Sequence, residues 1–150
     1  MSVAPEGFEP ITDEGAFVQH IGPLLGRDGV VGLQIDERHI NSFGKAQGGV
    51  LATLVDFANA HNVRRESEEE NPSVATVSLT VDYLGSADEG DWVEAHVTVE
   101  RLGGTLAFVD CSCKVGDREA ESGGVTLRRH GEGDLGAKSI EEVVEVVRAA

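Results

Sequence analysis

The stretch QGGVLATLVDFANAHNV, residues 47–63, decides the fold of this chain. Gly48 and Gly49 open a run whose apolar residues cover nearly every face of a helix. Such a helix must be covered on more than one side, so a sheet has to wrap around it. Asp56 lies in the middle of the run, where an unpaired carboxylate is costly to bury. The stretch therefore predicts a central core helix and a candidate site at Asp56.

The remaining patterns predict one α+β domain over residues 1–150, with its core at about 29–130. A short helix is expected over 12–25, and Ser139 and Glu142 form a capping box that predicts a C-terminal helix over 139–149. Alternating apolar residues predict five strands, namely 29–40, 76–84, 91–101, 105–115 and, less regularly, 118–130. The last four follow one another with short turns, which predicts an antiparallel meander.

Composition excludes several classes of protein. The net charge of −15 argues against a nucleic-acid partner, because that binding depends on neutralising phosphates. No apolar run is long enough to span a membrane, and MSVAPEGFEP lacks the features of a secretory signal, so a cytoplasmic protein is expected. Cys111 and Cys113 are two residues apart in a strand-like run, which is typical of buried apolar groups rather than of a metal site.

A family resemblance rests on HINSFGKAQGGVLATLVDFANA (39–60) and on the strands that follow. Its landmarks are an Asn shortly before a Gly-Gly pair, an acidic residue eight positions after the first of those glycines, and a strand that ends in Tyr-Leu. In this order the segments resemble the hotdog-fold acyl-CoA thioesterases of the phenylacetate-pathway (PaaI-like) type. The resemblance runs from about Val31 to His130 and implies a sheet of about five strands around the central helix.

The resemblance also implies roles for particular residues. Asp56 is the expected catalytic carboxylate, either as general base on water or as nucleophile, and the Gly48 backbone N–H is expected to donate to the thioester carbonyl. Asn41 is expected to help position the water or the acyl group, and Thr76 stands where relatives commonly have Ser or Thr near the acid. Members of the family are typically homodimers whose sheets join, often paired into a dimer of dimers.

Gln47 departs from the family pattern, because relatives usually have His immediately before the Gly-Gly pair. Gln keeps a hydrogen-bonding side chain at this candidate catalytic position but cannot titrate. An alternative is therefore a non-catalytic acyl-CoA-binding protein, a sensor or a scaffold. A hydratase or dehydratase of the same fold fits poorly, since it normally needs a His paired with the acid.

The spacing of Gly48 and Asp56 independently favours a dimer. Eight residues separate them, and at ~1.5 Å per residue that is roughly 12 Å along one helix. A base and an oxyanion donor that serve one carbonyl each need contacts of about 3 Å. Two antiparallel copies of the helix could meet this requirement across a two-fold axis, whereas one copy could not.

The substrate expected from the resemblance is an acyl-CoA, and coenzyme A is then part of the substrate rather than a cofactor. Its phosphates need local cations in this acidic chain, so an acidic carrier protein is a poorer partner than a free CoA ester. The candidate substrate-binding residues are Gly49, Arg64, Arg65, Arg128 and Arg129. The sequence does not determine which acyl group the substrate carries. It also leaves open a plainer interpretation, in which Asp56 simply faces solvent on an exposed stripe together with Thr53 and Asn59.

Overall fold

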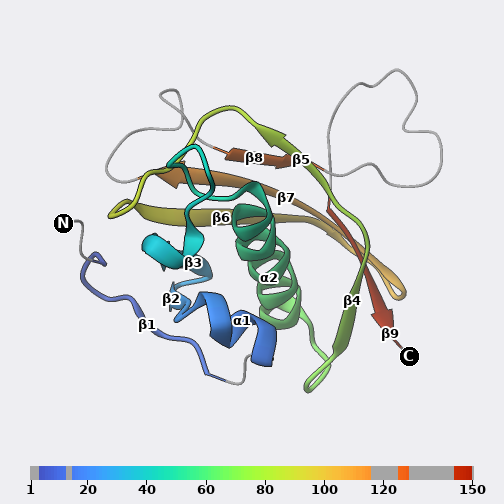
Figure 1. Ribbon diagram of the computed structural model, residues 1–150. Coiled ribbons are helices and arrows are strands. Elements are labelled where there is room, and N and C mark those ends of the chain that lie inside the picture. Colours follow the sequence, from blue (N-terminus) through green and yellow to red (C-terminus); the bar gives the residue numbers. More distant parts are fainter. Residues whose placement is uncertain (1–3, 13–14, 116–124, 129–143, 150) are drawn as a thin grey trace.

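The computed structural model describes residues 4–12, 15–115, 125–128 and 144–149 (Figure 1). In chain order the elements are β1 (Glu9–Pro10), α1 (Ala16–Ile21), β2 (Leu25–Arg27), β3 (Val30–Gln34), the 3₁₀ helix η1 (Glu37–His39), α2 (Gly48–Glu66), β4 (Ser73–Ser78), β5 (Thr80–Tyr83), β6 (Trp92–Leu102), β7 (Leu106–Val115), β8 (Val125–Arg128) and β9 (Val144–Ala149). The fold is α+β, with one long helix against an antiparallel sheet.

Helix α2 is the central element that residues 47–63 predict. It runs for 19 residues, and its sheet-facing side is buried, including Leu51, Leu54, Val55 and Ala58. The last turn ends where the backbone N–H of Ser67 donates to the carbonyl of Val63. Figure 1 shows α2 crossing the sheet, with β6 and β7 behind it and β4 arching along one side.

The sheet is antiparallel throughout the described part of the chain and has the order β1-β2-β3-β6-β7-β8-β5. The long hairpin of β6 and β7 forms its middle, and β3 pairs with β6. Strand β9 pairs with both β4 and β7, so that β8 and β9 together separate β7 from the β4–β5 segment. The sheet therefore places β4 and β5 at one edge.

This order confirms the last part of the predicted meander, because β6, β7 and β8 pair in sequence order, and corrects its first part. The strand expected over 76–84 is two strands, β4 and β5, which meet at Leu79, and neither pairs with β6. The connection over 84–91 instead carries the chain across to the middle of the sheet. The hairpin of β6 and β7 is confirmed, with a tight turn in which the N–H of Gly103 donates to the carbonyl of Leu106.

The predicted C-terminal helix over 139–149 is wrong where the structure describes it, because Val144–Ala149 form strand β9. The segment is rich in valine, whose branched Cβ favours strands, and β9 supplies the hydrogen-bonding partner that both β4 and β7 need. The capping box at Ser139 and Glu142 lies outside the described residues.

The N-terminal helix is shorter than the predicted range 12–25. Helix α1 has six residues, and Leu25 already belongs to β2. Strands β2 and β3 form a hairpin around Asp28 and Gly29, which both have positive φ, as a two-residue Asp-Gly turn requires. The strand expected over 29–40 is limited to β3 and is followed by η1.

The core lies between α2 and the sheet. Its buried members come from α2, from β3 and from the facing sides of β6 and β7. Cys111 and Cys113 belong to it as predicted, both buried on the same face of β7. Burial raises the pKa of the Cys111 thiol well above its usual value, so it is unreactive as a nucleophile at neutral pH.

Candidate active site

A pocket of about 380 Å³ lies beside α2, on the side that faces β4. Helix α2 supplies most of its wall, β4 supplies two residues, and the start of α1 closes one end. The lining residues are Gly15, Val18, Thr53, Asp56, Phe57, Ala60, Arg64, Val74 and Thr76. The pocket thus brings a carboxylate, a hydroxyl and a guanidinium together among apolar side chains.

Asp56 and Thr76 are in direct contact. The Thr76 hydroxyl donates to Asp56 Oδ1 over 2.5 Å, and this bond joins the middle of α2 to β4. Asp56 is half-buried rather than turned fully to solvent. This hydrogen bond orients the carboxylate, and the acceptor capacity of its second oxygen remains available for a proton donor in the pocket. The structure therefore joins two residues that are 20 positions apart in the sequence.

The plainer interpretation placed Asp56 on an exposed stripe with Thr53 and Asn59. Thr53 does line the same pocket, but Asn59 is completely buried on the other side of Asp56. Asp56 thus stands at the border between the pocket and the core. No exposed stripe contains all three residues.

Gly48 is the first residue of α2. Its backbone N–H, like that of Gly49, has no acceptor among the described residues, as is usual at the start of a helix. The space around the two glycines differs. A Cβ on Gly48 would lie 3.2 Å from the ring and hydroxyl of Tyr83, whereas one on Gly49 would meet nothing within 4 Å. Gly49 therefore leaves the helix start open to an incoming group.

Gln47 precedes α2 in an extended conformation and its side chain is exposed. That side chain makes no capping bond. Its backbone is well anchored instead, because the N–H donates to the carbonyl of His39 over 2.7 Å and the carbonyl accepts from Val50. At position 47, the described hydrogen bonds at the entry to the helix are therefore made by the main chain and not by the side chain.

Asn41 organises the loop that leads to α2. Its Oδ1 accepts hydrogen bonds from the backbone N–H groups of Phe43 and Lys45, at 2.9 and 3.1 Å. The side-chain oxygen is thus committed to the loop, so any contact of Asn41 with a substrate has to use its amide N–H₂ group.

The histidines near the site make contacts that stabilise the fold, and none of the contacts described is with the candidate carboxylate. His39 is buried, its Nδ1 accepts from the Asp36 amide, and its Nε2 therefore carries the proton that bonds the carbonyl of Ile21. His61 stacks on Phe57 and does not line the pocket. Burial, and then the neighbouring arginines at the end of α2, lower the pKa of His61, so it is neutral at pH 7.

The candidate cations occupy different places. Arg64 lines the same pocket as Asp56, about two helical turns further along α2, whereas the Arg65 guanidinium lies against Gly29 in the β2–β3 turn, where an added Cβ would be 2.2 Å from its Nη1. Arg128 ends β8, opposite Thr80. Arg129 lies outside the described residues. Of the four predicted cations, Arg64 is therefore the one that the described residues place in the pocket wall.

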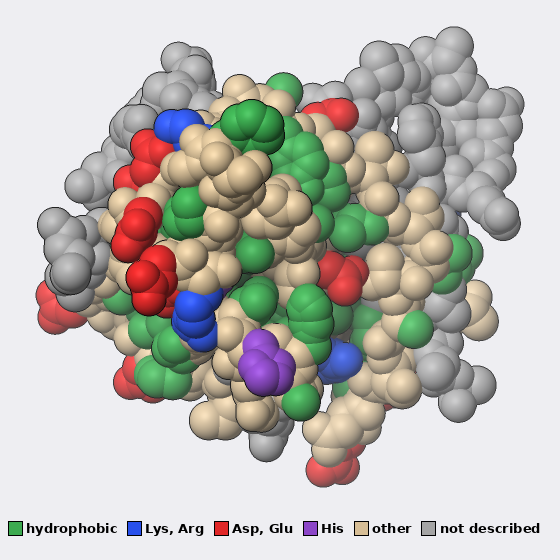
Figure 2. All heavy atoms as spheres, in the orientation of Figure 1, with side chains coloured by type: hydrophobic (Ala, Val, Ile, Leu, Met, Phe, Trp, Pro, Cys, Tyr) green, Lys and Arg blue, Asp and Glu red, His purple; other side chains and the backbone are tan. Residues whose placement is uncertain are grey.

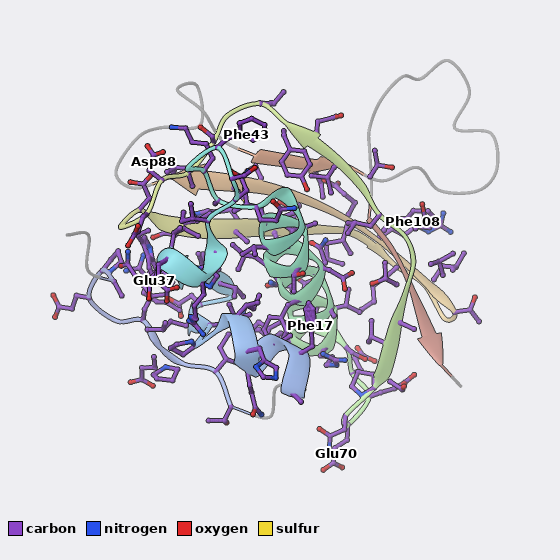
Figure 3. All side chains as sticks on the ribbon, in the orientation of Figure 1. Phe17, Glu37, Phe43, Glu70, Asp88 and Phe108 are labelled. Carbon is purple, nitrogen blue, oxygen red and sulfur yellow. The ribbon has the colours of Figure 1, made fainter. Side chains whose placement is uncertain are left out.

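Charged side chains are unevenly distributed over this face of the molecule. Figure 2 shows acidic side chains grouped along the side that carries η1 and the connection to β6, and Figure 3 labels Glu37 and Asp88 there. The surface over α2 is mostly uncharged (Figure 2). The overall net charge of −15 is therefore not concentrated around the pocket. Within the described ranges no cluster of three potential metal ligands occurs.

Residues 43–122 match the family model described as "Thioesterase superfamily". The chain belongs to the thioesterase superfamily. This match spans α2, the site residues of β4 and the central hairpin, so the family assignment made from the Gly-Gly segment is confirmed. No helix in the described part of this thioesterase-superfamily protein combines the length and hydrophobicity that membrane crossing requires.

Two curated relatives are similar in sequence. "Putative esterase PA0474" of Pseudomonas aeruginosa is 37% identical over 123 residues, which are 79% of this chain and 91% of that protein. Human "Acyl-coenzyme A thioesterase 13" is 30% identical over 76 residues, which are 51% of this chain and 53% of the human protein.

Two solved structures share the fold of this thioesterase-superfamily protein. The PaaI protein of the E. coli phenylacetic acid degradation operon has a TM-score of 0.69 at 16% identity, covering 92% of this chain and 87% of PaaI. The smu.793 protein of Streptococcus mutans, bound to acetyl-CoA, has a TM-score of 0.63 at 15% identity, covering 99% of this chain and 93% of its own. The resemblance to PaaI-like proteins is thus confirmed at the level of the fold.

Tyr83 is the contact that sequence reasoning missed. It was recognised only as part of a strand end, yet it packs on Gly48 and bonds its carbonyl. In the sequence it is recognisable only as an aromatic residue with a hydroxyl at the end of an edge strand. Its hydrogen-bond acceptor, the carbonyl of Gly48, is 35 positions away and cannot be identified without the fold.

Proposed function

We propose that this protein hydrolyses acyl-CoA thioesters to a free acid and coenzyme A. The observation that carries the proposal is the hydrogen-bonded pair of Asp56 and Thr76 beside an open pocket, on the helix whose first N–H groups are uncommitted. Membership of the thioesterase superfamily supports the reaction class. The name of the human relative and the acetyl-CoA in the S. mutans structure support CoA esters as the substrates.

The chemistry needs a base and a donor to the carbonyl oxygen. As general base, Asp56 takes a proton from water while the water oxygen bonds to the thioester carbon. The electron pair of the C=O bond moves to oxygen, where the Gly48 N–H and the positive end of the helix dipole stabilise it. When the carbonyl re-forms, the C–S bond breaks and the CoA thiolate leaves and takes up a proton. As nucleophile, Asp56 attacks the carbon directly, and the C–S bond breaks as the CoA thiolate leaves and takes up a proton. Water then adds to the acyl carbon of the resulting mixed anhydride, which releases the free acid and restores the Asp56 carboxylate.

We infer that the working unit is a homodimer. Gly48 and Asp56 lie roughly 12 Å apart along one continuous helix, at ~1.5 Å rise per residue, so one subunit cannot bring both to one carbonyl. The edge formed by β4 and β5 also exposes large apolar side chains, with 50% of Val77, 49% of Tyr83 and 66% of Leu84 accessible. An apolar sheet edge of this kind favours pairing with a second copy. That two such dimers pair into a tetramer is proposed only because members of the family often do so.

Coenzyme A binding is assigned to the basic end of α2. Arg64 is the first candidate for a phosphate contact, because it lines the pocket with Asp56. Gly49 leaves space at the other end of the helix for the acyl thioester. Arg65, Arg128 and Arg129 remain secondary candidates, since no described contact brings them to the pocket. Asn41 and Gln47 border the helix start and are candidates to contact the acyl group.

The test is a panel of acyl-CoAs assayed for thiol release with the wild type and with Asp56→Asn. We expect turnover in the wild type and a drop of at least ~10²-fold in kcat for the variant. Glu66→Gln is a matched control, because it removes one negative charge from the same helix outside this pocket. Undiminished turnover in Asp56→Asn would remove Asp56 from the mechanism.

Gln47 motivates the second candidate function, a protein that binds acyl-CoA without hydrolysing it. Its side chain cannot titrate, and in this structure it does not cap the helix. Binding of CoA esters in the same panel, measured calorimetrically, with no thiol release would favour this function. A gain of activity in Gln47→His would indicate instead that the substitution lowers an existing activity.

A further inference from the structure

Tyr83 fastens the end of β5 to the beginning of α2. Its hydroxyl donates to the carbonyl oxygen of Gly48 over 2.7 Å. Its ring rests on the same residue, since a Cβ at Gly48 would lie 3.2 Å from both Cζ and Oη. Partial burial raises the pKa of the phenol, so it stays protonated and keeps its donor at physiological pH.

The β4–β5 edge therefore makes two hydrogen bonds to α2 that both matter to the proposed chemistry. Thr76 of β4 bonds the Asp56 carboxylate, and Tyr83 of β5 bonds the Gly48 carbonyl. These contacts lie at the middle and at the start of the same helix. The β4–β5 segment thus hydrogen-bonds both the proposed base and the residue that carries the proposed oxyanion donor.

The start of α2 has an evident need for such support. Its first two residues are Gly48 and Gly49, and glycine has nearly the lowest helix propensity of all residues. Gln47 makes no side-chain cap that could compensate. First turns fray readily, and two glycines without a cap leave their N–H groups poorly oriented unless another element holds the turn.

We propose that Tyr83 is a positioning residue of the thioesterase site. It holds the first turn of α2 so that the N–H groups of Gly48 and Gly49 keep the direction in which they meet the developing oxyanion. The Gly48 carbonyl and the Gly49 N–H belong to one peptide group, so the phenol also polarises that N–H and makes it a stronger donor. This inference rests on the proposed hydrolysis.

The decisive variant is Tyr83→Phe, which removes the hydroxyl and keeps the ring on Gly48. We expect kcat for the best acyl-CoA to fall about 10-fold, with KM changed less than about two-fold, because the lost interaction matters most in the transition state. Amide hydrogen exchange at Val50 and Leu51 should become faster, since both N–H groups donate to the Gln47 carbonyl and report on the first turn.

Thr76→Val is the matched comparison, because it removes the other described hydrogen bond from this edge to α2. It should lower kcat without changing exchange at Val50 and Leu51. For Tyr83→Phe, a wild-type kcat would overturn the proposal whatever the exchange shows, and a lower kcat with unchanged exchange would overturn the route through the helix. If the wild type hydrolyses no acyl-CoA, the proposed function fails. Faster amide exchange in Tyr83→Phe would then show that Tyr83 only stabilises the first turn of α2.

Discussion

Three polar residues on α2, all at least partly buried, differ in how their polar atoms are hydrogen-bonded. Asn62 donates from Nδ2 to the carbonyls of Gly29 and Ala58, at 2.8 Å each. Asp56 accepts from Thr76 at the border of the pocket. Asn59 is completely buried, and neither atom of its amide has a partner among the described residues. Since buried polar groups are nearly always hydrogen-bonded, Asn59 is a net cost to this fold as it stands.

Replacing the two asparagines by leucine should therefore have opposite effects on stability. Asn59→Leu removes an unpaired buried amide and should raise the free energy of unfolding by about 1 kcal/mol. Asn62→Leu leaves the buried Gly29 carbonyl without its donor and should lower the free energy of unfolding by about 2 kcal/mol. Urea unfolding of both variants measures the contrast. A loss of stability in Asn59→Leu would mean that its amide has a partner in the native protein.

At the scale of elements, the packing of β3 on β6 depends on one glycine. Trp92 belongs to β6, and its buried ring lies over Gly32 of the neighbouring strand β3. A Cβ on Gly32 would lie 2.0 Å from Cζ2 of this ring. The indole N–H is held by Glu94 at 2.8 Å, and Phe8 packs edge-on against the ring. The ring is thus fixed on several sides and cannot move aside for a side chain on β3.

Gly32→Ala should lower the free energy of unfolding by about 3 kcal/mol, because it forces a rigid buried ring out of its place. Gly104→Ala is the control, since an added Cβ there meets nothing within 4 Å, and it should change stability by less than about 0.5 kcal/mol. Trp92 is the one tryptophan in the sequence, so its fluorescence reports the unfolding directly. Equal stabilities of the two variants would contradict the packing described here.

At the scale of the whole molecule, we infer that the proposed reaction uses two chains. Figure 3 places Phe43 at the end of the molecule where α2 begins, and this ring is 86% exposed. Val77, Tyr83 and Leu84, on β4, β5 and just after β5, are further large apolar side chains that are exposed. Two copies that join at the β4–β5 edge would place the helix start of each near the middle of the other helix.

Mixed dimers test this arrangement. Asp56→Asn removes the base. Gly48→Pro removes one N–H donor at the first helical position, where the backbone tolerates proline, and its added Cβ also presses on Tyr83. Each variant alone should be nearly inactive. A dimer of one with the other keeps one intact site, so random mixing should restore about a quarter of wild-type activity under two-fold symmetry. Activity that stays at the level of the parents, in samples shown by light scattering to be dimeric, would mean that the site lies within one chain.

The candidate site was predictable in part from local chemistry. Asp56 was identifiable because a carboxylate inside an apolar helix is costly, and Gly48 because two glycines open that helix. The contact of Asp56 with Thr76 could be expected only from the family. The partner of Tyr83 was not accessible, since it depends on how an edge strand folds back on α2, 35 positions away in the sequence. The hydrogen bonds of Asn41 are local to its own loop, and they commit its side-chain oxygen to the loop rather than to a substrate.

The sequence by itself determined the central helix, the hairpin of β6 and β7 and the family, because periodicity and the Gly-Gly segment are local and α2 is apolar nearly all round. Only the tertiary structure decided the strand order and the fate of the C-terminal segment. A capping box and an apolar stripe favour a helix there, but the open edges of β4 and β7 offer backbone hydrogen bonds that a strand alone can satisfy, and Val144–Ala149 pair with both.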